Sequence, residues 1–313
     1  MKKIILLLLM LLLCACNNTD KSNDDSLTIV TPKGAPVLAF YDQIKNNNYI
    51  RVDASAINAL WLGDNSPDII VCDILSGYKA IKNSANYSMA SVITAGNYYL
   101  ASTGNDDNKT LDIGDTVVLF GNENQAPNML FHLLYGNDYD NDLIYESDVL
   151  TASSDLINGK TLAGQVVDYV FMAQPALYSA TQKNKNVSIY EDIGEKYYKK
   201  TNSRIIQATV FVNNDTDRTK IEDFLKRLKT SISNGIQNVN LISNALSIYE
   251  DEEAIVEYGF NPNVILKAFK MKNYEGLNSL GLCYYDAFEI KDDIDYFLDI
   301  FGMENTINED YFE

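Results

Sequence analysis

The sequence predicts an α/β protein of two lobes, each a mostly parallel sheet flanked by helices, with a helical C-terminal part. Short apolar runs alternate with stretches of helical spacing over 27–190, which is typical of parallel strands joined by helices. A polar stretch over 105–115 divides this alternation into two halves. After residue 213, apolar side chains recur at helical spacing, so the last third is expected to be mostly helical.

The first lobe begins with strands and helices in strict alternation. Its strands are rich in Ile and Val and are short enough to cross one small sheet. Strands are predicted over 27–30, 49–52, 68–72, 89–94 and 98–102, and helices over 36–44, through residue 61 and over 77–82.

The second lobe repeats this pattern, and the chain then returns to the first. Strands are predicted over 116–120, 143–145, 166–172 and 187–190, and helices over 127–135, 150–158 and 175–182. A strand over 205–212 is expected to rejoin the first sheet. Asp217 or Thr219 is expected to cap the long helix that follows this strand. The predicted lobes are therefore 27–104 with 205–313, and 105–204.

Residues 1–26 have the composition of a leader and a tether. Lys2 and Lys3 precede an apolar run over 4–13, which is too short to cross a membrane as a helix and is typical of a signal peptide. Leu-Cys-Ala-Cys at 13–16 resembles a bacterial lipobox, which implies removal of 1–15 and acyl chains such as palmitate on Cys16. The alternative is an ordinary secretory signal cut nearby. Residues 16–26 would form a polar tether, because 17–26 contain no apolar side chain.

Charge and reactive side chains restrict the function classes. The formal charge of -18 makes the surface repel nucleic acid and anionic headgroups. With His132 as the only histidine and no cysteine pair at zinc spacing, neither a metal nor a cofactor is predicted. No motif supplies a nucleophile with its base, so no catalytic residue is named and an enzyme is not predicted. Whether Cys72 and Cys283 pair is left open.

Two strand-to-helix loops, 31–36 and 121–127, share a glycine near the strand end and Ala-Pro at the expected helix start. Helix starts hold free N–H groups, and ligands of open α/β sheets lie beyond the carboxyl ends of the strands. The loops therefore either face each other across a ligand cleft or are two well-formed helix starts. The residues concerned are Lys33, Gly34, Ala35 and Pro36 in the first loop, and Asn124, Gln125 and Ala126 in the second.

Asp73 and Gln174 each follow an apolar strand, which is where a ligand would lie. The stretches around them, 67–73 and 156–175, and the C-terminal 302–312 resemble in their order the substrate-binding lipoproteins of ABC importers. The closer likeness is to the group with sulfonate, nitrate or taurine, and thiamine-precursor binding proteins. It covers the chain from about Leu27 onward and implies the type II periplasmic-binding-protein fold.

The resemblance also implies a function. A small molecule would be trapped between two lobes joined by crossing strands, and the closed protein would dock on an ABC permease driven by a cytoplasmic ATPase. The protein would act as a monomer at the extracytoplasmic face of the cell membrane, held by its lipid anchor. Besides the two loops, the resemblance places Asp73, Ile74, Met172 and Gln174 at the ligand.

Two departures leave the ligand open. Gln174 stands where the family pattern often has glutamate, and the loops contain one cation, Lys33. A sulfonate-like ligand is therefore disfavoured but not excluded, and the 21 tyrosines make an aromatic ligand an alternative. Two other functions also remain open, a cofactor-precursor enzyme on the same fold and a surface sensor or adhesin without transport.

Overall fold

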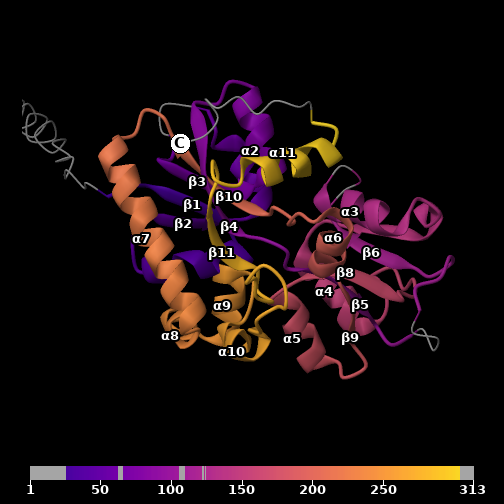
Figure 1. The fold of residues 1–313 in the computed structure, drawn as a ribbon. Coiled ribbons are helices and arrows are strands. Elements are labelled where there is room, and N and C mark those ends of the chain that lie inside the picture. The colour runs from indigo at the N-terminus through magenta and orange to yellow at the C-terminus, as the bar shows by residue number, and fades with distance from the viewer. Residues whose placement is uncertain (1–25, 63–65, 106–109, 122, 124, 304–313) are drawn as a thin grey trace, which may run out of the picture.

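The computed structural model describes residues 26–62, 66–105, 110–121, 123 and 125–303. The predicted leader, the lipidation site Cys16, the loop residue Asn124 and the C-terminal stretch from residue 304 lie outside these residues. Two sheets lie side by side and the chain crosses between them (Figure 1).

The first sheet has six strands in the order β11-β4-β10-β3-β1-β2. β1 pairs in parallel with β2 and β3, whereas β10 is antiparallel to β3 and β4, and β11 is antiparallel to β4. The bounds are β1 Ile29–Pro32, β2 Tyr49–Val52, β3 Ile69–Asp73, β4 Tyr87–Thr94, β10 Ala208–Asn213 and β11 Leu282–Asp286.

Helices cover both faces of this sheet, which explains why its central strands are apolar without alternation. Along β3, Ile70 and Cys72 join the core under α2, while Ile69 and Val71 join the core under α7. The helices after the first strands are η1 Ala35–Gln43, η2 Ala54–Ala59 and α2 Ile74–Lys82. The C-terminal helices are α7 Arg218–Gln237, α8 Asn240–Leu246, α9 Asp251–Tyr258, η4 Pro262–Val264, α10 Ile265–Ala268 and α11 Lys291–Ile300.

The second sheet has five strands in the order β7-β6-β8-β5-β9. β6 pairs in parallel with β7 and β8, and β5 is antiparallel to β8 and β9. α4 and α5 cover one face, and α3 and α6 cover the other. The bounds are β5 Tyr98–Ser102, β6 Val117–Phe120, α3 Ala126–Tyr135, η3 Asp140–Asp142, β7 Leu143–Glu146, α4 Val149–Asn158, β8 Tyr169–Ala173, α5 Ala176–Lys183, β9 Ser188–Asp192 and α6 Ile193–Thr201.

The predicted α/β fold with two sheets and a helical C-terminal part is confirmed, and so is the return of the chain to the first sheet through β10. Asp217 caps α7 by accepting hydrogen bonds from the N–H groups of Thr219 and Lys220. The strands joined by helices are parallel, as predicted, whereas the strands that cross between the sheets add antiparallel pairs to each.

Three features differ from the sequence-based description. The predicted boundary at residue 105 leaves β5 with the first lobe, but β5 pairs in the second sheet, so the change of sheet falls between Thr94 and Tyr98. The helix predicted over 36–44 is the 3₁₀ helix η1, interrupted by non-helical angles at Phe40. The strand β11 and the helix α6 were not predicted.

Cys72 and Cys283 are free and buried. They lie on β3 and β11, which are separated by β10 and β4. Three interstrand spacings amount to about 14 Å, far beyond the separation that a disulfide allows. Each thiol instead lies against a backbone carbonyl, of Asp73 and of Val92 respectively.

Candidate functional site

The carboxyl ends of the parallel strands in both sheets lie beside the segments that cross between them. In the first sheet, β3 ends at Asp73, which is paired with Ala208 at the start of β10. In the second, β8 ends at Ala173, which is paired with Tyr98 at the start of β5. The crossing residues 95–97 and 205–207, here called the crossover, adjoin these two pairs. In each sheet the carboxyl end of a parallel strand therefore adjoins the crossover, and ligands of open α/β sheets bind at this edge.

Asn97 and Gln207 join the two crossing segments to each other. Gln207 Oε1 accepts a hydrogen bond from the Asn97 backbone N–H at 2.9 Å, and Gln207 Nε2 donates to Asn97 Oδ1 at 2.6 Å. Asn97 Nδ2 donates in turn to the carbonyl oxygens of Leu280 and Gln174, at 3.0 and 3.3 Å. These neutral side chains satisfy one another and join the two crossing segments in one register.

Three aromatic rings gather at the second sheet's edge of the crossover. The ring of Tyr98 lies 5.3 Å from that of Phe171 and 5.9 Å from that of Phe120, centroid to centroid, and the two phenylalanine rings are 6.2 Å apart. Phe171 is fully buried, whereas Tyr98 and Phe120 are partly exposed. This aromatic group, Tyr98 with Phe120 and Phe171, forms an apolar wall at the edge where the sheets meet.

Asp73 of the first sheet and Tyr98 of the second are close enough to interact electrostatically. Asp73 is exposed, and its Oδ1 caps α2 by accepting from the Ser76 N–H at 2.9 Å. Burial raises the pKa of Tyr98 to about 12, a hydrogen bond with the Gln207 side chain lowers it in part, and the charge of Asp73 raises it. Tyr98 is therefore a neutral phenol near pH 7, hydrogen-bonded to the Gln207 side chain and within electrostatic reach of the Asp73 carboxylate.

The predicted residues of the first loop have partners within their own lobe. The Lys33 ammonium lies 3.1 Å from the Asp53 carboxylate. The Gly34 N–H donates to the Tyr258 carbonyl oxygen at 2.7 Å, and its φ of 107° is one that favours glycine. Ala35 and Pro36 begin η1 and are partly exposed. The Gly34 N–H is thus occupied by the end of α9 and is not available to a ligand.

The second loop folds back on itself at its helix start. Gly121 has a φ of 92°, and a Cβ on it would lie 2.0 Å from Gln125 Oε1, so the Gln125 side chain covers this glycine. Gln125 precedes α3, whose first turn holds the predicted proline, and Ala126 packs against the core shared with α2. Ala-Pro therefore marks the start of a helix in both loops, as predicted. That the two loops face each other across a gap stays a prediction.

Three further predicted ligand residues are buried. Ile74 is 1% exposed, and its N–H donates to the Gln207 carbonyl oxygen. Gln174 is 5% exposed, and its Oε1 accepts from the Tyr178 N–H at the start of α5. Met172 is fully buried under α4 and α5, on the opposite face of the second sheet from Phe171. All three side chains are enclosed by the fold, so Ile74, Gln174 and Met172 are left out of the proposed site.

Lys272 joins the C-terminal segment to the crossover through the Gly96 carbonyl oxygen. Its side chain is 6% exposed, and its ammonium donates to the Gly96 carbonyl oxygen at 2.6 Å and lies 2.7 Å from an Asp192 carboxylate oxygen. The ammonium also lies 4.7 Å from the ring centroid of Tyr99. Burial lowers the pKa of Lys272, while Asp192 opposes that shift. Asp192 caps α6, so one cation joins the crossover and the second lobe.

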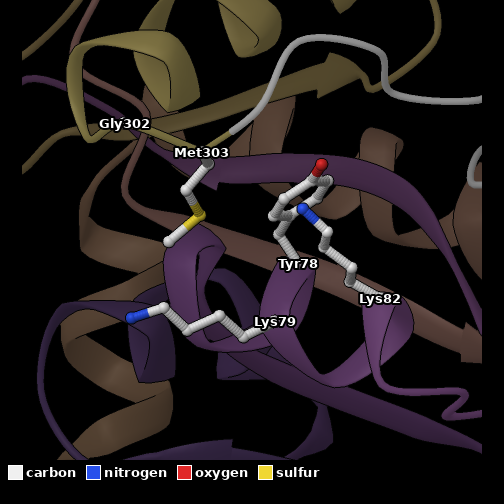
Figure 2. Close-up of a pocket in the computed structure, with 5 residues that line it drawn as sticks. All are labelled: Tyr78, Lys79, Lys82, Gly302 and Met303. Atoms are coloured by element: carbon white, nitrogen blue, oxygen red, sulfur yellow. The ribbon is translucent and has the colours of Figure 1, made fainter.

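A pocket of about 300 Å³ lies elsewhere, on the outer side of α2. Figure 2 shows Met303 above this helix, with Lys79 on one side and Tyr78 and Lys82 on the other. The pocket borders Met303, where the described part of the chain ends, and we assign it no function. Its lining residues are Tyr78, Lys79, Lys82, Gly302 and Met303.

The described residues contain neither a metal-binding cluster nor a membrane-spanning helix. Among residues 26–303, with their short gaps, no group of three or more His, Cys, Asp or Glu side chains is arranged to hold a metal ion. In the same part of the chain, no helix combines the length and the apolar character that crossing a membrane requires.

Comparison with known proteins gives structural neighbours only. No protein-family model matches the sequence, and no curated protein matches it either. An ABC transporter protein from Parabacteroides distasonis has a TM-score of 0.72 at 18% identity, over 93% of this chain and 99% of that one. The periplasmic aliphatic sulphonate binding protein of Escherichia coli has a TM-score of 0.56 at 15% identity, over 87% and 86%.

A Candida albicans protein described as having the generic periplasmic binding protein fold has a TM-score of 0.53 at 10% identity, over 91% of this chain and 92% of its own. Identities this low show the fold alone. The chain therefore has the periplasmic binding protein fold, as the resemblance implied.

The residues that the structure adds to the candidate site are Tyr98, Phe120 and Gln207. Sequence reasoning assigned all three to strands, because their neighbours are apolar. One local signal marks Tyr98: Gly96-Asn97 interrupts the apolar sequence between two strands, where the chain changes sheet. Gln207 lies near Tyr98 only through the crossing of segments that are 110 residues apart.

Proposed function

We propose that this protein is the solute-binding component of an ABC import system and holds a small molecule between its two lobes. The observation that carries the proposal is the meeting of both carboxyl edges at one crossover, with Asp73 on one side and Tyr98 on the other. The fold supports it, because structural neighbours over most of the chain include ABC transporter and sulphonate-binding proteins. The site residues carried into the proposal are Ala35, Pro36, Asp73, Tyr98, Phe120, Ala126 and Gln207.

The test is ligand-dependent closure. Small-angle scattering and thermal melting would be measured on the full-length, detergent-extracted protein, with and without the compound that co-purifies with it. Because a ligand bound between lobes favours the closed state, we expect a smaller radius of gyration and a higher Tm, in proportion to ligand concentration. A protein that releases no small molecule on denaturation, and whose radius responds to no metabolite, would refute the proposal.

Membrane attachment through Cys16 is part of the same proposal. The lipobox-like 13–16 and the polar 17–26 support an anchor with a tether, and the net charge of -18 disfavours electrostatic attachment to anionic lipid. We expect metabolic labelling with a palmitate analogue to mark the wild type and not Cys16→Ser, and the variant to leave the membrane fraction. A Cys14→Ser variant is the matched control and should be labelled normally. Equal labelling of wild type and Cys16→Ser would contradict the anchor.

A further inference from the structure

The aromatic group at the crossover consists of one buried ring and two partly exposed rings. Phe171 is fully buried behind Tyr98 and Phe120, and each of the three rings is within 6.2 Å of the other two. Tilted contacts of this kind hold the rings in place before any ligand arrives. A fixed aromatic surface binds another flat ring well, because little side-chain freedom remains to be lost.

The polar groups beside this surface are acidic or neutral. The Tyr98 hydroxyl has the Gln207 side chain as its hydrogen-bond partner and the Asp73 carboxylate within electrostatic reach. Asp73 is exposed at the end of β3, where it caps α2, so its carboxylate is accessible from solvent. A carboxylate attracts N–H donors and cations and repels an anion.

The cations close to the crossover and the first loop are already engaged with carboxylates. Each lies within about one hydrogen-bond length of its partner, so its charge is largely neutralised for a ligand. The pairs are Lys33 with Asp53, Arg51 with Glu257, Arg204 with Glu275 and Asp293, and Lys272 with Asp192. A sulfonate, which is a permanent anion, would meet Asp73 without a matching cation from these residues.

We infer that the ligand is a flat aromatic or heteroaromatic molecule, neutral or positively charged, which stacks on Tyr98 and Phe120 with a donor group directed at Asp73. The inference rests on the proposed function and names the ligand class of that same site. On this inference the protein differs in ligand class from the sulphonate-binding protein whose fold it shares.

The experiment has two arms on the full-length, detergent-extracted protein. Mass spectrometry identifies the small molecule released by denaturation, and thermal shifts are recorded with adenine, cytosine, 4-aminopyridine and benzylamine against taurine and butanesulfonate. We expect a ring compound without an anionic group in the first arm, and a higher Tm with ring compounds only in the second.

Substitutions at the crossover then test where the ring of the ligand binds. Tyr98→Leu should weaken binding of the ring compound about tenfold, whereas Tyr98→Phe, which keeps the ring, should change it less than about threefold. Asp73→Asn keeps the cap of α2 and should weaken an amine-bearing ring about tenfold. Tyr296→Leu, at a 43% exposed position on α11, is the matched control and should leave binding unchanged.

The outcomes separate this inference from the proposed function. A bound sulfonate or phosphonate would overturn the ligand class and leave the binding function intact. Binding of a ring compound that is indifferent to both Tyr98→Leu and Asp73→Asn would overturn the assignment of the site. If nothing is released on denaturation and no compound raises the Tm, both the inference and the proposed function fail.

Discussion

Asp155 is a buried acid whose pKa is raised. It lies in α4 with 1% of its surface exposed, and Glu146 at the end of β7 faces it. Burial and the Glu146 charge raise the pKa of Asp155 from 3.8 to about 6. Because the folded state holds this proton more tightly than the unfolded state, the stabilisation is complete below about pH 4 and is lost as the pH rises through about 6.

We therefore expect Asp155→Asn to raise the free energy of unfolding at pH 8 by about 2 kcal/mol and to change it little at pH 4. Asparagine keeps the shape and supplies a donor where the protonated acid had one. Urea titrations at both pH values measure the difference. Equal effects at pH 4 and pH 8 would contradict the raised pKa.

The pKa of Asp148 is shifted in the opposite direction to that of Asp155, so Asp148 is the matched comparison for the pH dependence of stability. Partial burial pushes its pKa up, but hydrogen bonds from Thr151, Ser147 and Leu150 outweigh that and lower it. Its contribution to stability is therefore present above about pH 4 and lost as the pH falls. Asp148→Asn keeps an N-cap and should reduce the change of the unfolding free energy with pH below about pH 4. Asp155→Asn should reduce that change between about pH 4 and pH 7.

At the scale of elements, α6 depends on the absence of a side chain at Gly194. A Cβ there would lie 2.5 Å from the Gly96 carbonyl oxygen and 2.6 Å from the Tyr274 hydroxyl. Gly96 is backbone of the crossover and also accepts from Lys272, so this contact has little room to relax. The close approach fixes where α6 begins relative to the crossing segments.

Gly194→Ala should lower the free energy of unfolding by about 1–3 kcal/mol, although alanine favours a helix. Gly235→Ala in α7 is the control, because the added Cβ would meet side chains and no backbone, with Ile242 Cδ1 at 2.9 Å and Tyr41 Cε1 at 3.1 Å. We expect the control to stay within about 1 kcal/mol of wild type. Chemical denaturation measures both, and similar losses in the two variants would refute the role of the crossover contact.

The sequence predicted those elements whose residues carry their own signal. β3 and α7 are examples, the one through an unbroken apolar run and the other through its apolar stripe and its cap at Asp217. β5 was assigned to the wrong sheet because Tyr98–Ser102 is apolar in either environment, and only its pairing with β8 decides. α6 was missed because its polar face, with Glu195 and Lys199, resembles a loop in composition.

The candidate site was predicted only in part, for the same reason. Asp73 follows directly after a recognisable strand, so its position at the sheet edge could be predicted. Lys33 and Gly34 lie in the loop after β1, as predicted, but their polar groups are engaged by Asp53 and Tyr258, which no local pattern reveals. The rings of Tyr98 and Phe120 meet through the order of strands in the second sheet, which is a property of the whole fold.

At the scale of the whole molecule, Lys272 joins parts that belong to different lobes. The Asp192 carboxylate begins α6 in the second lobe, while Lys272 belongs to the segment that leads into β11 of the first sheet. The second cation of this region, Arg204, lies 2.9 Å from Asp293, which is on α11. Charge pairs therefore connect the segments on either side of the crossover.

We expect Lys272→Met to lower the free energy of unfolding by about 2–4 kcal/mol, because it leaves Asp192 without its partner. Asp192→Asn keeps the cap of α6, so the double variant should lose less than the sum of the two single variants. Urea denaturation of the four proteins measures this coupling. Additive losses would show that the pair does not couple the lobes.

The burial of Cys72 and Cys283 has a consequence for how the protein can be made. Both thiols are enclosed, at 3% and 5% exposure, and burial raises the pKa of each, so neither reacts readily in the native state. Folding then has no step that requires an oxidising compartment or a disulfide isomerase. Production without the leader inside a reducing cell should yield the same fold, and dithiothreitol should leave its melting curve unchanged.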